Sequence, residues 1–219
     1  MTRTALIIFD CDGVLVDSER ISHTVLRQML AEVGVQLTLQ EALDRFMGAS
    51  TAKGLALMEG LMGRSAPPAF LAELRERTFE AFGTELTAVP GVLDMLMSLE
   101  LPSCVASNGS REKMNFTLHR TGLLHHFADR MFSADEVARP KPAPDLFLHA
   151  AAAMKTAAQA CVVVEDSATG VAAAKAAGMR VFGYAAMGQA AKLHAAGADR
   201  VFADMAEVGS ALRGSTPDR

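Results

Sequence analysis

The chain has 219 residues, of which 50% are hydrophobic and 21% are charged, and its formal net charge is −4. This is the composition of an ordinary globular protein with enough apolar residues for a core. A slightly acidic balance excludes the basic surface that is typical of nucleic-acid-binding proteins, so we expect no nucleic-acid partner. An anionic substrate would need local positive groups, because the overall charge does not attract it.

The apolar segments are too short for a membrane span or a secretory leader. The first run, residues 5–9, stops at Asp10, and no run approaches the roughly 18 apolar residues that a spanning helix needs. The three cysteines, Cys11, Cys104 and Cys161, are an odd number without the spacing of a disulfide framework. We therefore expect a cytoplasmic protein that makes no membrane contact, and we expect a monomer.

In chain order, strand-like and helix-like segments alternate, with one interruption. Residues 5–9 are predicted to form a buried strand that ends in the turn 10–13. Helical periodicity then covers about 18–33, 39–47, 51–62 and 68–83, and no convincing strand occurs between 14 and 86. Beyond residue 90 the predicted helices are 92–99, 111–121, 145–154 and 168–177, and the predicted strands are 103–107, 130–133, 161–164, 181–184 and 200–202.

This alternation predicts an α/β protein with a mostly parallel, Rossmann-like sheet that carries helices on both faces. The helix-only block interrupts the alternation directly after the first strand. We interpret residues 15–86 as an inserted helical domain, and residues 1–14 and 87–219 as the Rossmann-like core.

Polar residues collect where the predicted strands end. In open parallel sheets, ligands bind outside the carboxyl ends of the strands. Four separate segments therefore bring polar groups to one edge of the sheet. These groups are Asp10 and Asp12, Ser107 and Asn108, Lys141, and Glu165 and Asp166.

Asp10 and Asp12 supply two carboxylates that are two residues apart, so in extended backbone both point to the same side. One can attack phosphorus to form an aspartyl-phosphate, while the other acts as general acid and base. The alternative is that Asp-x-Asp-Gly is only turn chemistry. The matching residues downstream favour the catalytic interpretation.

Glu165 and Asp166 close the apolar run 162–164, and hard carboxylate oxygens of this kind suit Mg²⁺. The alternative is a purely structural role, in which the two acids only stabilise the N-terminus of the following helix. Both interpretations can hold together, so the sequence predicts a magnesium site that also begins a helix.

The segment Ser107-Asn108-Gly109 lies between a strand and a helix, where a hydroxyl and backbone N–H groups can hold a phosphate. A plain turn and helix cap would look the same. Lys141 lies among the prolines of the segment 139–145, which hold the backbone extended. A fixed ammonium there would neutralise the nucleophile and the phosphate, whereas the alternative is a solvated lysine in a surface loop.

Together these segments resemble the four motifs of the haloacid dehalogenase-like hydrolases. The matching residues are Asp-Cys-Asp-Gly-Val-Leu-Val-Asp-Ser-Glu19, Ser-Asn-Gly109, Lys-Pro-Ala-Pro-Asp145 and Val-Val-Glu-Asp-Ser167. The chain is most similar to the branch with a helical cap after the first motif, which includes β-phosphoglucomutase and sugar-phosphate phosphatases. The resemblance implies that the block 15–86 is this cap.

The resemblance also implies roles for single residues. Asp10 would be the nucleophile and Asp12 the general acid and base. Ser107 and Lys141 would hold the phosphate, and we expect Asn108, next to Ser107, to bind it as well. Mg²⁺ would be bound by Asp10, Asp166 and the carbonyl of Asp12, with Glu165 assisting. The implied partner is a small phosphorylated metabolite.

Departures from the family's patterns separate its activities. Dehalogenating members lack an acid at the position of Asp12, so its presence favours phosphoryl transfer. The mutases carry a cap histidine where this chain has Ser22 and a cap arginine where it has Thr51. We therefore expect a phosphatase for a sugar phosphate or sugar-acid phosphate. A phosphosugar mutase and a non-catalytic binding protein with the same fold are the alternatives.

Overall fold

The computed structural model describes residues 3–49 and 51–214, and within it the chain forms two compact units. One unit contains the residues up to Val16 and those from Ala88 onward, and the other is Asp17–Thr87. The chain leaves and re-enters the first unit at adjacent points. Val16 bridges to Ala88, and Asp17 N–H donates to the Thr87 carbonyl at 3.0 Å.

The first unit is a six-stranded sheet in which every neighbouring pair is parallel and the order is β3-β2-β1-β4-β5-β6. The strands are β1 (Leu6–Phe9), β2 (Ser103–Ser107), β3 (Met131–Ser133), β4 (Cys161–Glu165), β5 (Arg180–Tyr184) and β6 (Arg200–Phe202). The strand order reverses between β1 and β4, which is the place where open sheets of this type bind ligands.

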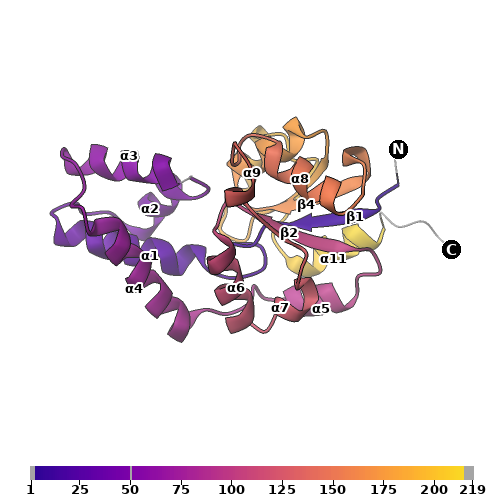
Figure 1. Cartoon of the computed structure of the whole chain (residues 1–219), viewed down its shortest axis with the longest axis horizontal. Coiled ribbons are helices and arrows are strands. Elements are labelled where there is room, and N and C mark those ends of the chain that lie inside the picture. The colour runs from indigo at the N-terminus through magenta and orange to yellow at the C-terminus, as the bar shows by residue number, and fades with distance from the viewer. Residues whose placement is uncertain (1–2, 50, 215–219) are drawn as a thin grey trace. The chain divides into compact units, whose positions relative to one another are not determined.

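Helices cover both faces of this sheet (Figure 1). They are α5 (Val92–Met97), α6 (Arg111–Arg120), α7 (Leu124–Phe127), α8 (Asp145–Ala153), α9 (Ala168–Ala176), α10 (Ala190–Ala195) and α11 (Met205–Arg213), with short 3₁₀ turns at Ala134–Glu136 and Ala158–Ala160. α8, α9 and α10 lie on one face, where a cluster that includes Ile8, Phe147 and Val163 is buried. On the other face α7 and α11 contact the sheet, and α5 packs on α11.

Because both faces are covered, the central strands are apolar throughout. All four residues of β1 are buried, and so are all five of β4. This confirms the predicted fold class, a Rossmann-like parallel sheet with helices on both faces and an inserted helical block. Three helices were absent from the prediction, α7, α10 and α11. α7 has four residues and α10 has six, which is too short to show a clear periodicity.

Among its described residues, the second unit contains four helices joined by loops and no strand. It consists of α1 (Glu19–Glu32), α2 (Leu39–Phe46), α3 (Thr51–Met62) and α4 (Phe70–Glu85). Gly34, with φ of 92°, adopts the left-handed conformation that follows α1, and a capping box of Thr38 and Glu41 begins α2. The unit has an apolar cluster of its own, which includes Leu30, Phe46 and Phe70.

Helix α8 offers a matched test of the packing on the sheet. Leu146 is fully buried, whereas Leu148 on the same helix is 42% exposed. Changing Leu146 to Ala should lower the free energy of unfolding by about 2–5 kcal/mol, because it leaves a cavity. The same change at Leu148 should cost about 0.5 kcal/mol or less. Urea denaturation of the two variants measures the difference, and equal losses would contradict the packing described here.

Candidate active site

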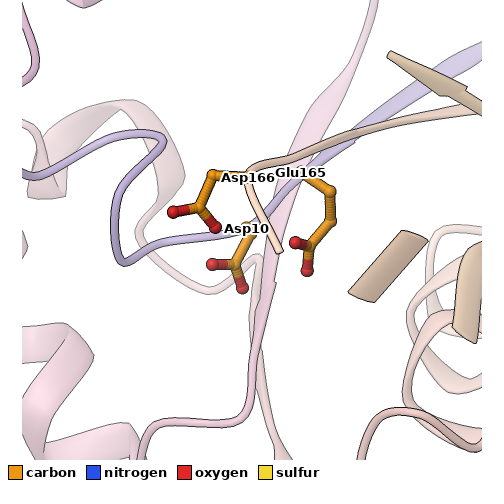
Figure 2. Close-up of side chains that lie close together, drawn as sticks. All are labelled: Asp10, Glu165 and Asp166. Carbon is orange, nitrogen blue, oxygen red and sulfur yellow. The ribbon is translucent and has the colours of Figure 1, made fainter. Parts of the chain in front are cut away.

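The carboxyl ends of β1 and β4 carry a cluster of three buried acids. Asp10 follows β1, Glu165 ends β4 and Asp166 comes next. Each offers a carboxylate oxygen, and these oxygens lie within 4.8 Å of one another. Figure 2 shows the three side chains side by side. The backbone pairing between β1 and β4 continues to Asp10, whose N–H donates to the Val164 carbonyl at 3.0 Å. This hydrogen bond fixes the backbone of Asp10.

Lys141 holds two of these acids together. Its Nζ lies 2.7 Å from Asp10 Oδ1 and 2.6 Å from Glu165 Oε1, and its side chain is only 3% exposed. The ammonium also lies 4.6 Å from the centre of the Phe147 ring. Burial alone would lower the pKa of Lys141, but the two carboxylates outweigh burial and hold that pKa above its ordinary value. The lysine is therefore a buried cation and not a solvated surface residue.

The charge of the cluster is not balanced by Lys141 alone. Burial raises the pKa of the Asp10 carboxyl to about 7, with Lys141 opposing the shift and Glu165 and Asp12 adding to it. Three clustered carboxylates, of which two pair with the one ammonium, leave an excess of negative charge in a buried place. Their oxygens are the hard ligands that Mg²⁺ prefers, so this donor set fits a magnesium ion.

Glu165 is fixed from the side of α9. Ser167 donates to Glu165 Oε2 through its N–H at 3.0 Å and its hydroxyl at 2.9 Å. The same hydroxyl accepts the N–H of Gly170 at 3.0 Å, so Ser167 is the N-cap of α9. Helix α9 therefore begins directly after Glu165 and Asp166, as the sequence predicted for the helix that follows these two acids. A Cβ atom at Gly170 would lie 1.7 Å from Glu165 Oε1, so any side chain there would force the Glu165 carboxylate to move.

Asn108 lies at the end of β2, and its side chain binds the backbone of Lys141. Its Nδ2 donates to the Lys141 carbonyl at 3.2 Å, and its Oδ1 accepts the Lys141 N–H at 3.0 Å. This pair of bonds fixes the start of the lysine side chain. Ser107 is buried, and its Oγ accepts the Gly109 N–H at 3.0 Å. The structure thus brings the second and third predicted segments together.

Asp12 lies in the turn that follows Asp10. Gly13, with φ of 73°, donates its N–H to the Val16 carbonyl at 2.9 Å, and this closes the turn. One oxygen of the Asp12 carboxylate lies 2.8 Å from Lys113 Nζ. Cys11 lies between these two acids in the sequence. Burial and both carboxylates raise the pKa of its thiol well above the ordinary value, so Cys11 is not a thiolate nucleophile.

All seven sequence-predicted residues therefore lie around the carboxyl ends of β1, β2 and β4. Sequence reasoning missed three others that the geometry brings in: Lys113, Ser167 and Gly170. Ser167 is the last residue of the segment Val-Val-Glu-Asp-Ser167, but the sequence analysis gave it no role. Lys113 is three residues after the N-cap Ser110, in the first turn of α6, and that position is a signal that could have directed attention to it.

A buried acid cluster with a lysine at the switch point of a parallel sheet could hold a metal ion, and it lies where sheets of this type bind ligands. The chain belongs to the haloacid dehalogenase-like hydrolase family, whose model matches residues 7–184. It is 35% identical to 6-phosphogluconate phosphatase of Escherichia coli over 191 residues, which are 85% of this chain and 85% of that protein.

Solved structures show the same relationship. A haloacid dehalogenase-like protein of unknown function from Agrobacterium tumefaciens has a TM-score of 0.87 and 34% identity, with 96% of this chain and 98% of that chain covered. A family hydrolase from Deinococcus radiodurans, solved with bound phosphate and sodium, has a TM-score of 0.83 and 34% identity, with coverages of 98% and 97%. The comparisons confirm the family and the predicted enzyme class, a phosphoric monoester hydrolase.

The contact of Gly170 with Glu165 gives a prediction about stability. Changing Gly170 to Ala should lower the free energy of unfolding by about 1–3 kcal/mol, because Glu165 is held by Ser167 and Lys141 and cannot turn away. Gly60 on α3 is a matched control, since a Cβ there meets nothing within 4 Å. Its change to Ala should raise helix stability by up to about 1 kcal/mol. Thermal or urea denaturation checks both, and an undiminished stability of the Gly170 variant would contradict the contact.

Proposed function

We propose that this protein is a magnesium-dependent phosphatase that hydrolyses a small sugar phosphate or sugar-acid phosphate through an aspartyl-phosphate on Asp10. The observation that carries this proposal is the buried contact of Lys141 with Asp10 and Glu165, beside Asp166. The likeness to a 6-phosphogluconate phosphatase supports the substrate class. The cytoplasmic location and the monomeric state stay predictions, and among residues 3–49 and 51–214 no helix has the length and apolarity to cross a membrane.

In the first half of the proposed reaction, an oxygen of Asp10 attacks phosphorus and the bond from phosphorus to the leaving oxygen breaks. Asp12 gives its proton to that oxygen. In the second half, Asp12 takes a proton from water, the water oxygen attacks phosphorus, and the bond from Asp10 to phosphorus breaks. Inorganic phosphate leaves, and both aspartates return to their starting states.

The remaining residues bind and position. Ser107, through its hydroxyl, and Lys141 hold the phosphate, and Asn108 adds its backbone N–H while its side chain holds Lys141 in place. Asp10, Asp166 and the carbonyl of Asp12 would ligate Mg²⁺, and Glu165 assists by holding Lys141. When bound, the ion offsets the charge between the nucleophile and the phosphate. The helical unit Asp17–Thr87 is proposed as the cap that excludes water and selects the substrate.

Changing Asp10 to Asn should reduce turnover on the order of 10³-fold or more, because the amide cannot act as the nucleophile. The assay measures inorganic phosphate released from sugar phosphates, sugar-acid phosphates, phosphoglycolate and nucleotides in the presence of Mg²⁺. Asp94→Asn on α5, an exposed position, is the matched control and should keep full activity. Near-normal turnover by the Asp10 variant would refute the mechanism. Conversion of a sugar phosphate without phosphate release would identify a mutase instead.

The metal site has a test that needs no substrate. Added Mg²⁺ should stabilise the protein against heat, by about 2.7 kcal/mol at a hundred times its Kd. Changing Asp166 to Asn should move this response to a higher Mg²⁺ concentration, because a charged ligand is lost from the cluster. The Asp94→Asn variant should respond like the unmodified protein. A response that is unchanged in the Asp166 variant would rule out its role as a ligand.

A further inference from the structure

Lys113 is a charged residue at the site that has no role in the proposed mechanism. It belongs to the first turn of α6, where its N–H donates to the Oγ of the N-cap residue Ser110 at 3.2 Å. Its Nζ lies 2.8 Å from Asp12 Oδ1, and the two side chains are 26% and 14% exposed. Ion pairs on open surfaces contribute little to stability, about 0–1 kcal/mol. This pair is more enclosed, and it involves the proposed acid and base.

The second oxygen of Asp12 faces the turn that precedes α6. A Cβ atom on Gly109 would lie 3.5 Å from Asp12 Oδ2 and 3.5 Å from the Lys113 stem. The turn is itself held in place, because Ser133 Oγ donates to the Gly109 carbonyl at 2.9 Å. One oxygen of the Asp12 carboxylate therefore pairs with the Lys113 ammonium, and the other lies near a fixed backbone turn.

We propose that Lys113 is a positioning residue for Asp12, which orients the carboxylate for proton exchange with the leaving oxygen and then with water. The inference rests on the proposed function. A general acid must lie within hydrogen-bond reach of the oxygen that it protonates, and a small displacement reduces the rate. Asp12 extends from a short turn, so its side-chain rotamer needs a partner from another element. α6 supplies that partner from a fixed N-terminus.

The experiment compares two leaving groups. Lys113→Met keeps most of the apolar stem and removes the charge, whereas Lys113→Arg keeps the charge. The substrates are p-nitrophenyl phosphate, whose leaving group departs without protonation, and the alkyl phosphate of the panel that is turned over fastest. Single-turnover release of the leaving group isolates the step in which Asp12 acts as an acid.

Lys113→Met should slow release from the alkyl phosphate about 10-fold or more, which is a part of the 10²–10⁴-fold that a general acid contributes. Release of p-nitrophenol should change much less, KM should stay within about twofold for both substrates, and Lys113→Arg should restore most of the rate. In an Asp12→Asn background, Lys113→Met should have no further effect, because the lysine acts through Asp12.

Lys175→Met is the matched control. Lys175 is an exposed residue of α9, and its Nζ forms an ion pair of similar length, 2.9 Å, with Asp199 Oδ1. It should leave both rates unchanged. Equal losses on the two substrates, or losses that multiply with those of Asp12→Asn, would overturn the positioning role. A raised KM with an unchanged rate would also overturn it, because Lys113 would then bind substrate directly.

The outcomes also separate this inference from the proposed function. If the unmodified protein releases no phosphate from any ester with Mg²⁺, the proposed function fails and the role of Lys113 fails with it. If it is active and the Lys113 variants show no leaving-group dependence, only the role of Lys113 fails. The Mg²⁺-dependent thermal shift should be the same in Lys113→Met as in the unmodified protein, and a lost shift would indicate a damaged site and overturn the inference.

Discussion

The buried ammonium of Lys141 is the constraint on which the rest of the site depends. A charged group in a protein interior is costly unless opposite charges and hydrogen bonds compensate it. Asp10 and Glu165 do so at 2.7 and 2.6 Å, and each comes from the end of a different central strand. The lysine itself lies in a loop between β3 and α8, so three segments distant in sequence must meet before any of these charges is stabilised.

Once that contact is required, several local features follow from it. Glu165 faces Lys141 at a place where α9 approaches closely, and a Cβ atom at Gly170 would meet the Glu165 carboxylate. Lys141 can face the acids only if its backbone is fixed, and the Asn108 side chain supplies both a donor and an acceptor for that purpose. These neighbours carry no charge, yet they decide where the charged groups lie. A mutation of either one acts on the acids indirectly.

Much of this could be predicted, because the strong signals are local. Apolar runs ended by acids mark β1 and β4, and parallel strands bring their carboxyl ends to one edge, so Asp10 and Glu165 were found from the sequence alone. Helices α7 and α10 were not found because they are short. The contacts of Asn108 with Lys141 and of Lys113 with Asp12 join positions 33 and 101 residues apart, and no local pattern encodes which side chains meet across such distances.

The residues proposed for chemistry and the unit proposed for substrate selection are separate parts of the fold. Every side chain of the proposed mechanism belongs to the sheet unit, whose central strands are buried on both faces. The unit Asp17–Thr87 has its own apolar cluster and joins the sheet unit through two adjacent chain crossings. Because its helices are stabilised by that separate core, their outer residues can change without disturbing Lys141 and its acids. If the inserted unit selects the substrate as proposed, the phosphoryl-transfer site can stay the same while the helices of that unit change.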